Sequence, residues 1–114
     1  MNKKAVGISG ELSAQDYLKK KGYTIISANQ KIAGVEIDIL AKKGNLLVLC
    51  EVKTRENVLF GQGIESVGYG RQQRYIRSAK LLTARREYQN CDVRFDVIEI
   101  LRDEINHVED AFRG

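Results

Sequence analysis

The chain has 114 residues, of which 43% are hydrophobic and 30% are charged, and its formal net charge is +4. This length allows one domain of ordinary size, and this composition excludes a disordered chain, which would have few hydrophobic residues and one dominant sign of charge. Because no apolar run approaches the roughly 18–20 residues of a membrane span and the N-terminus lacks a signal-peptide core, we expect a soluble cytoplasmic protein without a membrane partner.

The first predicted element is a helix over residues 9–21. Ser9 is a suitable N-cap, Glu11 lies in the first turn, and Gly22 follows three lysines as a stop signal. Three strands are expected after this helix, and a turn at residues 43–45 joins the last two as a hairpin. The predicted strands cover residues 23–30, 35–42 and 46–53.

The second half begins with a glycine-rich loop around Gly61 and Gly63. A long helix is predicted from about residue 71 to 88, followed by a strand at 93–101 and a weaker strand at 105–108. The order α-β-β-β-α-β indicates an α/β (α+β) fold, with one mixed central sheet flanked by helices. We expect a single domain over residues 1–114, with a core of about 7–100 and a C-terminal strand or tail at 101–114.

The third expected strand carries charges where the pattern predicts burial. Residues 46–50 form a continuous apolar run, which is typical of a strand covered on both faces, and Glu51, Val52 and Lys53 follow it directly. Side chains alternate along a strand, so Glu51 and Lys53 project from the same face as Leu47. The pattern therefore places both charges against a packed layer or a cleft.

Two further acids lie on the strand before the turn. Glu36 and Asp38 alternate with apolar residues and are therefore expected to share a face. If the turn at residues 43–45 pairs the two strands, Asp38 and Glu51 come close enough to share a cation.

Paired carboxylates of this kind indicate a metal. They repel each other unless they are protonated or bridged by a cation, and hard oxygen ligands suit Mg²⁺ or Mn²⁺. Such an ion at Asp38 and Glu51 would activate water and stabilise charge on a phosphate, while Lys53 would orient or polarise the nucleophile. This is the chemistry of phosphodiester hydrolysis. The alternative is that Glu51 and Lys53 form a salt-bridged strand end and that Asp38 is an edge residue.

The first helix also has charged residues within its apolar arc. At 100° per residue, Ile8, Leu12 and Leu18 define this arc, and the residues that fall inside it are Glu11, Gln15 and Lys19. Glu11 could therefore face the sheet and complete the acidic cluster. It could equally be a first-turn acid that stabilises the helix dipole.

Positive charge is concentrated between Glu65 and Glu87, where the chain has no acidic residue. The basic residues of this segment are Arg71, Arg74, Arg77, Lys80, Arg85 and Arg86. On the expected helix, Arg71, Arg74, Ser78 and Arg85 fall within about 60° of one another. Beside them lies an apolar side that is expected to pack, made by Tyr75, Ile76, Ala79 and Leu82. Arginines so arranged can contact successive phosphates, so we expect nucleic-acid binding with a marked salt dependence. The alternative is an ordinary solvated helix face.

Cysteine and histidine are too few for several common kinds of site. Cys50 and Cys91 form no Cys-x-x-Cys pair, which argues against a zinc ribbon or a disulfide framework, and we expect reduced thiols. His107 is the only histidine and follows a charged stretch, so we expect it at the solvated surface. We therefore set aside histidine-rich zinc sites and serine-type triads.

Several short motifs occur together in a recognisable order. They are Gly10-Glu11, Gly22-Tyr23, Asn29, Glu36-Ile37-Asp38, Glu51-Val52-Lys53-Thr54-Arg55, Phe60-Gly61 and Arg94-Phe95-Asp96-Val97. Together they resemble the bacterial YraN-like family, whose own function is poorly defined. That family's fold is similar to archaeal Holliday junction resolvases and other PD-(D/E)xK nucleases, so the resemblance implies a restriction-endonuclease-like sheet. The match runs from about Gly7 to Ile100.

The resemblance also assigns roles to individual residues. It implies that Asp38 and Glu51 ligate the metal, that the Val52 carbonyl can join them, and that Lys53 is the catalytic lysine. Glu11 matches an acid that the first helix of resolvase-like relatives contributes to the same site.

Other positions relate to the substrate or depart from the pattern. Thr54 and Arg55 would continue from the strand end toward nucleic acid, and Arg71 stands where the family usually has a lysine. Val35 departs from the pattern, which favours glycine before the Glu-Ile-Asp triplet. Resolvase-like relatives work as dimers, which leaves a homodimer open here.

The leading hypothesis is therefore a Mg²⁺- or Mn²⁺-dependent endonuclease directed at branched or otherwise structured DNA. DNA is favoured over RNA only through the resemblance. The competing hypothesis is a nucleic-acid-binding or protein-interaction module that keeps the fold without turnover. The set of Glu11, Asp38, Glu51 and Lys53 argues against it, because clustered acids near a phosphate-binding face repel the ligand. A third is a structural domain with a basic helix and no nucleic-acid role.

Overall fold

The computed structural model describes residues 3–55 and 67–114, with side chains described from residue 10 onward. The predicted glycine-rich loop at Gly61 and Gly63 lies outside the described residues. None of the described helices is long and apolar enough to cross a membrane.

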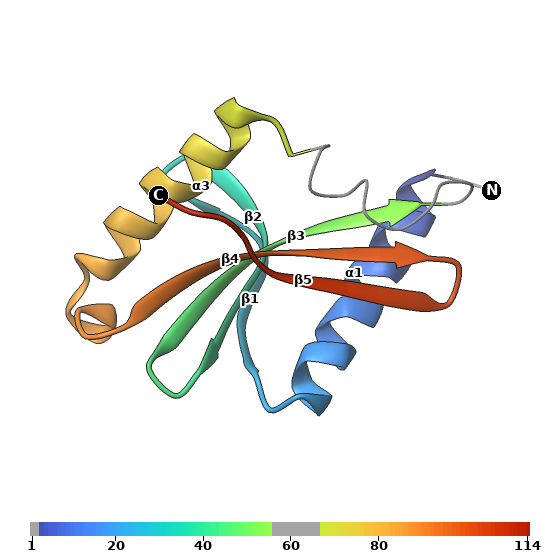
Figure 1. Ribbon diagram of the computed structural model, residues 1–114, viewed down its shortest axis with the longest axis horizontal. Coiled ribbons are helices and arrows are strands. Elements are labelled where there is room, and N and C mark those ends of the chain that lie inside the picture. Colours follow the sequence, from blue (N-terminus) through green and yellow to red (C-terminus); the bar gives the residue numbers. More distant parts are fainter. Residues whose placement is uncertain (1–2, 56–66) are drawn as a thin grey trace.

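The described residues form two α-helices, a short 3-10 helix and one sheet of five strands in the order β1-β2-β3-β4-β5 (Figure 1). The elements are α1 (Lys3–Lys20), β1 (Thr24–Ile32), β2 (Val35–Lys43), β3 (Leu46–Arg55), α3 (Tyr69–Thr83), η1 (Arg86–Tyr88), β4 (Asp92–Leu101) and β5 (Glu104–Phe112). β3 and β4 are parallel, and the other neighbours are antiparallel. The predicted mixed sheet and element order are confirmed.

The central strand β3 is covered on both faces, as its apolar run predicts. Leu47 and Leu49 belong to the core cluster that contains the buried face of α3. Val48 and Cys50 belong to a second cluster, which contains Ala14 and other residues of α1. The two helices therefore pack on opposite faces of β3, and Figure 1 shows them on opposite sides of the strands.

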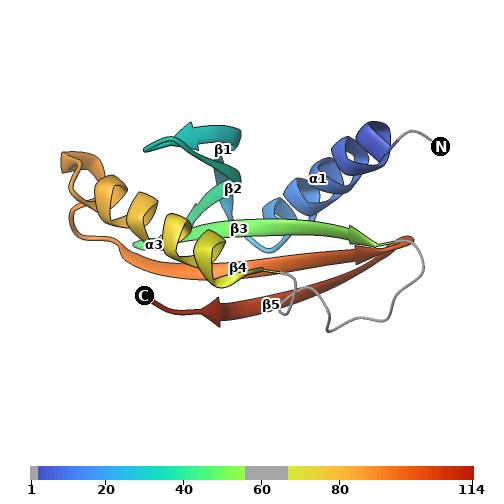
Figure 2. The ribbon, with the colours of Figure 1, turned by 90° about the horizontal axis from the view of Figure 1, so that it is seen from above.

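Near Asp38, the side chains of strand β2 stop alternating regularly between the two faces of the sheet. Ile37 and Leu40 lie in the cluster under α3, whereas Ile39 lies in the cluster under α1, so the simple alternation breaks between residues 37 and 40. Pairing with β3 extends only from Lys43 to Ile39, beyond which β2 leaves its neighbour. Figure 2 shows β1 and β2 turning away from β3 between the two helices. Asp38 therefore lies where the sheet splits.

Both predicted helices have the wrong bounds. α1 begins at Lys3, so Ser9 lies inside the helix and is not its N-cap; the sequence before Ser9 has no proline to stop a helix from starting earlier. α3 ends at Thr83, because Ala84 is its C-cap and Arg85 adopts an extended conformation before η1. The weak last strand is longer than expected, since its pairing with β4 continues to Phe112.

A glycine allows α1 to approach β3 closely. A Cβ atom at Gly10 would overlap Thr54 Oγ1 and lie 3.4 Å from Thr54 Cβ and 3.5 Å from Ile100 Cδ1. Gly10→Ala is therefore expected to lower the free energy of unfolding by about 1–2 kcal/mol in urea denaturation, because overpacking outweighs the gain in helix propensity. Gly70→Ala is the matched control, since its Cβ would meet only Arg74 Nη1 at an ordinary 3.5 Å. Equal effects of the two substitutions would contradict the close approach.

Candidate functional site

Two carboxylates meet at the point where β2 leaves β3. Asp38 Oδ2 accepts a hydrogen bond from the Val52 backbone N–H at 2.9 Å. Because the strand pairing has already ended at Ile39, the Asp38 side chain supplies an acceptor to this β3 amide. The side chains of Asp38 and Glu51 are only 13% and 5% exposed, so both acids are largely removed from water.

Helix α3 contributes two residues that link these acids. The Tyr75 hydroxyl donates to Glu51 Oε2 at 2.7 Å and accepts the Asp38 backbone N–H at 3.4 Å. Arg71 Nε and Nη2 each lie 3.0 Å from Glu51 Oε2, and Nη2 lies 4.0 Å from Asp38 Oδ1. On β3 itself, Lys53 Nζ lies 3.3 Å from Glu51 Oε1. The structure thus brings Asp38, Glu51, Lys53 and Arg71 together.

Lys53 and Arg71 match Asp38 and Glu51 in number, but Arg71 lies nearer to Glu51 than to Asp38. Burial and the negative charges of Glu51 and Glu11 together raise the pKa of Asp38 to about 7, although the Val52 N–H and Arg71 oppose this. Burial and the negative charges of Glu51 and Asp38 raise the pKa of Tyr75, so its hydroxyl stays protonated and acts as a donor. An additional cation at Asp38 would relieve the repulsion.

Glu11 is near this cluster without entering it. It acts on the pKa of Asp38, yet its carboxylate accepts a hydrogen bond from the Asn29 side chain on β1. Within the described side chains, no group of three His, Cys, Asp or Glu residues is arranged to hold a metal ion. The role of Glu11 as a metal ligand therefore stays a prediction.

The carboxylates of Asp38 and Glu51 are the kind of oxygen ligands that a hard divalent cation takes. Both present carboxylate oxygens from adjacent strands, and Asp38 Oδ1 faces Arg71 at the longer distance of 4.0 Å. Mg²⁺ is commonly bound through one or two carboxylates together with waters and substrate phosphate oxygens. Asp38 and Glu51 would hold the ion, which could activate water and stabilise charge on phosphate. The described contact of Val52 is through its amide, so a role for its carbonyl stays a prediction.

The arginines do not form the single cationic face that the periodicity predicted. Arg71 is turned toward the carboxylates, and Arg74 is exposed. Ser78 is buried and donates to the Ile32 carbonyl at 2.9 Å, while Arg85 lies beyond the end of α3. The prediction fails at Arg85 because α3 ends at Thr83, and at Arg71 and Ser78 because both side chains have partners on the sheet. Arg55 is half-buried at the end of β3, so its nucleic-acid role, like that of the other three, stays a prediction.

Sequence reasoning missed Tyr75 as a site residue. It occupies an apolar position of α3 and was expected only to pack. Its hydroxyl, however, forms hydrogen bonds with Glu51 on β3 and with the Asp38 backbone N–H on β2. A tyrosine placed where the helical pattern calls for an aliphatic residue was the available signal, because a buried hydroxyl requires a partner.

The expectation for His107 was wrong, because its side chain is only 4% exposed. Its Nε2 lies 2.6 Å from Oδ2 of Asp96, a residue with no exposed surface, and its Nδ1 lies 3.0 Å from the Tyr17 hydroxyl. Arg94 donates to both oxygens of Asp96 at 2.8 Å, and the Asp110 N–H donates at 3.1 Å. The network joins α1, β4 and β5. The two cysteines are free, as expected.

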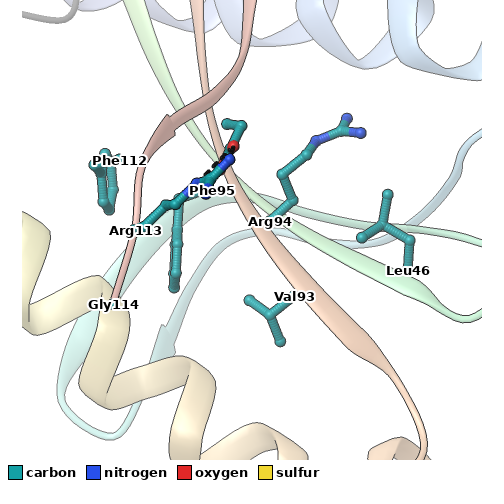
Figure 3. Close-up of a pocket in the computed structure, with 8 residues that line it drawn as sticks. Leu46, Val93, Arg94, Phe95, Phe112, Arg113 and Gly114 are labelled. Atoms are coloured by element: carbon teal, nitrogen blue, oxygen red, sulfur yellow. Dashed lines mark hydrogen bonds and ion pairs between the residues drawn. The ribbon is translucent and has the colours of Figure 1, made fainter.

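A separate cavity of about 470 Å³ lies near the C-terminus and is not lined by the carboxylate pair (Figure 3). Its walls include Leu46, Val93, Phe95, Phe112 and Gly114. Asp110, its one acidic lining residue, is paired with Arg113. The lining of this cavity therefore offers no second pair of acids.

Comparison with known proteins identifies close relatives. The family model of UPF0102, an uncharacterised protein family, matches residues 10–100. A UPF0102 protein of Caldicellulosiruptor saccharolyticus is 41% identical over 110 residues, covering 96% of this chain and 93% of that protein. One from Clostridioides difficile is 39% identical over 114 residues, covering 98% of this chain and all of that protein (100%). The expected YraN-like relationship is confirmed, and the chain belongs to the uncharacterised family UPF0102.

Proposed function

We propose that this protein is a Mg²⁺- or Mn²⁺-dependent endonuclease that hydrolyses phosphodiester bonds in structured or branched DNA. The observation that carries the proposal is the meeting of Asp38 and Glu51 beside Lys53 at the split between β2 and β3. Buried carboxylates at one point are costly to a fold even when they are paired with cations, and a fold gains no packing from them. A catalytic role explains their presence.

Each residue has a defined part in the proposed reaction. Asp38 and Glu51 would bind the metal, which would lower the pKa of bound water and offset charge on the phosphate. Lys53 would hold the nucleophile or stabilise the developing negative charge. Tyr75 fixes the orientation of Glu51 through a buried hydrogen bond of 2.7 Å. The exposed Arg74 would contact the substrate backbone.

A second candidate function is a nucleic-acid-binding module without turnover. One observation favours it: Arg71 already contacts Glu51 and faces Asp38, so the cluster has an internal counter-cation. In that case the basic residues of α3 would bind phosphates, and affinity would fall steeply with salt. The acids would then have only a structural role.

The test is cleavage of labelled four-way junction, flap, single-stranded and duplex DNA with Mg²⁺ or Mn²⁺. We expect Asp38→Ala and Lys53→Ala each to reduce the cleavage rate by at least about 100-fold, as removal of catalytic groups usually does. The matched controls are Asp16→Ala and Lys20→Ala, which remove exposed charges of the same sign from α1 and should leave the rate unchanged.

Two other results would contradict the nuclease proposal and favour a different function. Metal-independent binding of junctions without any cutting would support the binding module and contradict the nuclease proposal. Neither cutting nor salt-sensitive binding would favour a structural domain.

A further inference from the structure

We infer that Arg71 is a tethered counter-cation that couples metal binding to phosphate binding. Without substrate its guanidinium occupies the cation position at Glu51 and Asp38, and a substrate phosphate draws it away so that a divalent ion can bind. The inference rests on the proposed function, since it concerns the same site. It adds a second role to a residue expected only to bind nucleic acid.

The geometry places the guanidinium where a metal would need oxygen lone pairs. Glu51 Oε2 accepts from Arg71 Nε, Arg71 Nη2 and the Tyr75 hydroxyl, at 3.0, 3.0 and 2.7 Å. Its other oxygen faces Lys53 at 3.3 Å. A carboxylate oxygen with three donors cannot also ligate a metal at about 2.1 Å without losing at least one of them. Arg71 and the ion therefore compete for Oε2 of Glu51.

Arg71 is held at this position by more than one partner. Its Nη2 donates to the Glu36 carbonyl at 3.3 Å, and the guanidinium carbon lies 5.1 Å from the centre of the Tyr75 ring. The side chain is 30% exposed, so it is open to solvent and to an approaching phosphate. These contacts span β2, β3 and α3.

A phosphate is the natural competitor for this guanidinium. Arginine pairs with phosphate through two parallel N–H bonds and stays charged at all relevant pH values. The neighbouring basic residue Arg74 is exposed one turn further along α3, so a phosphate approaching there meets a second positive charge. A metal ion at Glu51 would release Arg71 for the phosphate, and a phosphate would draw Arg71 away from Glu51 and leave room for the metal ion. The binding of the two ligands would therefore be positively coupled.

The experiment measures Mn²⁺ binding to the full chain by titration calorimetry at low salt, without nucleic acid. We expect Arg71→Gln to bind Mn²⁺ about 10-fold more tightly than the wild type, within the usual range of coupling between sites. Arg77→Gln is the matched control, because it removes the same charge from an exposed position of the same helix. Its Mn²⁺ affinity should equal that of the wild type. Arg71→Lys keeps the positive charge but loses the planar pair of N–H donors, so we expect an intermediate Mn²⁺ affinity.

A second arm adds a short DNA duplex carrying a non-hydrolysable phosphate linkage. The duplex should tighten Mn²⁺ binding by the wild type and have a smaller effect on Arg71→Gln. Chemical denaturation confirms that each variant is folded. Mn²⁺ affinity in Arg71→Gln that is equal to or weaker than in the wild type would overturn the inference.

The outcomes separate this inference from the nuclease proposal. If the wild type cuts DNA but Arg71→Gln binds Mn²⁺ no more tightly, the coupling is wrong and the nuclease proposal stands. If Arg71→Gln binds more tightly but no DNA is cut, the coupling stands and the nuclease proposal fails.

Discussion

Asp96→Ala is expected to lower the free energy of unfolding by about 3–5 kcal/mol, the usual cost of removing one partner from a buried charge network. Asp96 has no exposed surface and accepts from Arg94, His107 and the Asp110 amide. Its loss would leave the Arg94 guanidinium, which is 19% exposed, without its closest counter-charge. Because the network also holds Tyr17 of α1, the helix that carries Glu11 would be loosened as well.

The measurement is urea denaturation near pH 7, with Asp92→Ala as the matched control on the same strand. Asp92 is exposed, so its replacement should change the free energy of unfolding by less than about 0.5 kcal/mol. An Asp96→Ala loss no larger than that of the control would contradict a stabilising role for the network.

The same residue gives a pH dependence with a defined sign. Burial alone would raise the pKa of Asp96, but hydrogen bonds from His107, Arg94 and the Asp110 amide lower it below its usual value. The folded state therefore binds fewer protons than the unfolded state as pH falls below about 4. The stabilisation is present above that range and is lost as the pH falls through it, so acid unfolding of Asp96→Ala should lack this contribution.

The fold was largely predictable because its elements have strong local patterns. The apolar run before Glu51 predicted a strand buried on both faces, and the turn at 43–45 predicted the β2–β3 hairpin; both are confirmed. The helix ends were predicted less well. Arg85 and Arg86 continue the basic segment past Thr83, and charge says little about where backbone hydrogen bonding stops.

The site was only partly predictable because tertiary geometry decides it. Alternation placed Glu51 with Lys53, and the structure brings them to 3.3 Å. No sequence pattern predicts that β2 leaves β3 beyond Ile39, and this departure brings Asp38 to the Val52 amide. His107 was misassigned for the same reason, since its buried partner Asp96 lies on a different strand.

Asp38→Asn is expected to stabilise the protein above neutral pH, although it should abolish the proposed activity. Burial and the negative charges of Glu51 and Glu11 raise the pKa of Asp38 to about 7, whereas an unfolded aspartate titrates near 4. Between these values the folded state binds more protons than the unfolded state, so the wild type loses stability as the pH rises from about 4 to 7. Asparagine cannot ionise and can still accept the Val52 N–H.

We therefore expect Asp38→Asn to exceed the wild type by about 2–4 kcal/mol in urea denaturation at pH 8, an order of magnitude set by roughly 1.4 kcal/mol per pKa unit. At pH 5 the two proteins should be closer, since the wild-type carboxyl is then mostly protonated. Asp16→Asn, an exposed control on α1, should show no such dependence. A variant less stable than the wild type at pH 8 would mean that Arg71 and the Val52 amide compensate the buried charge in full. A gain in stability with loss of cleavage would instead show that Asp38 is retained for chemistry at the expense of the fold, as is common for residues of active sites.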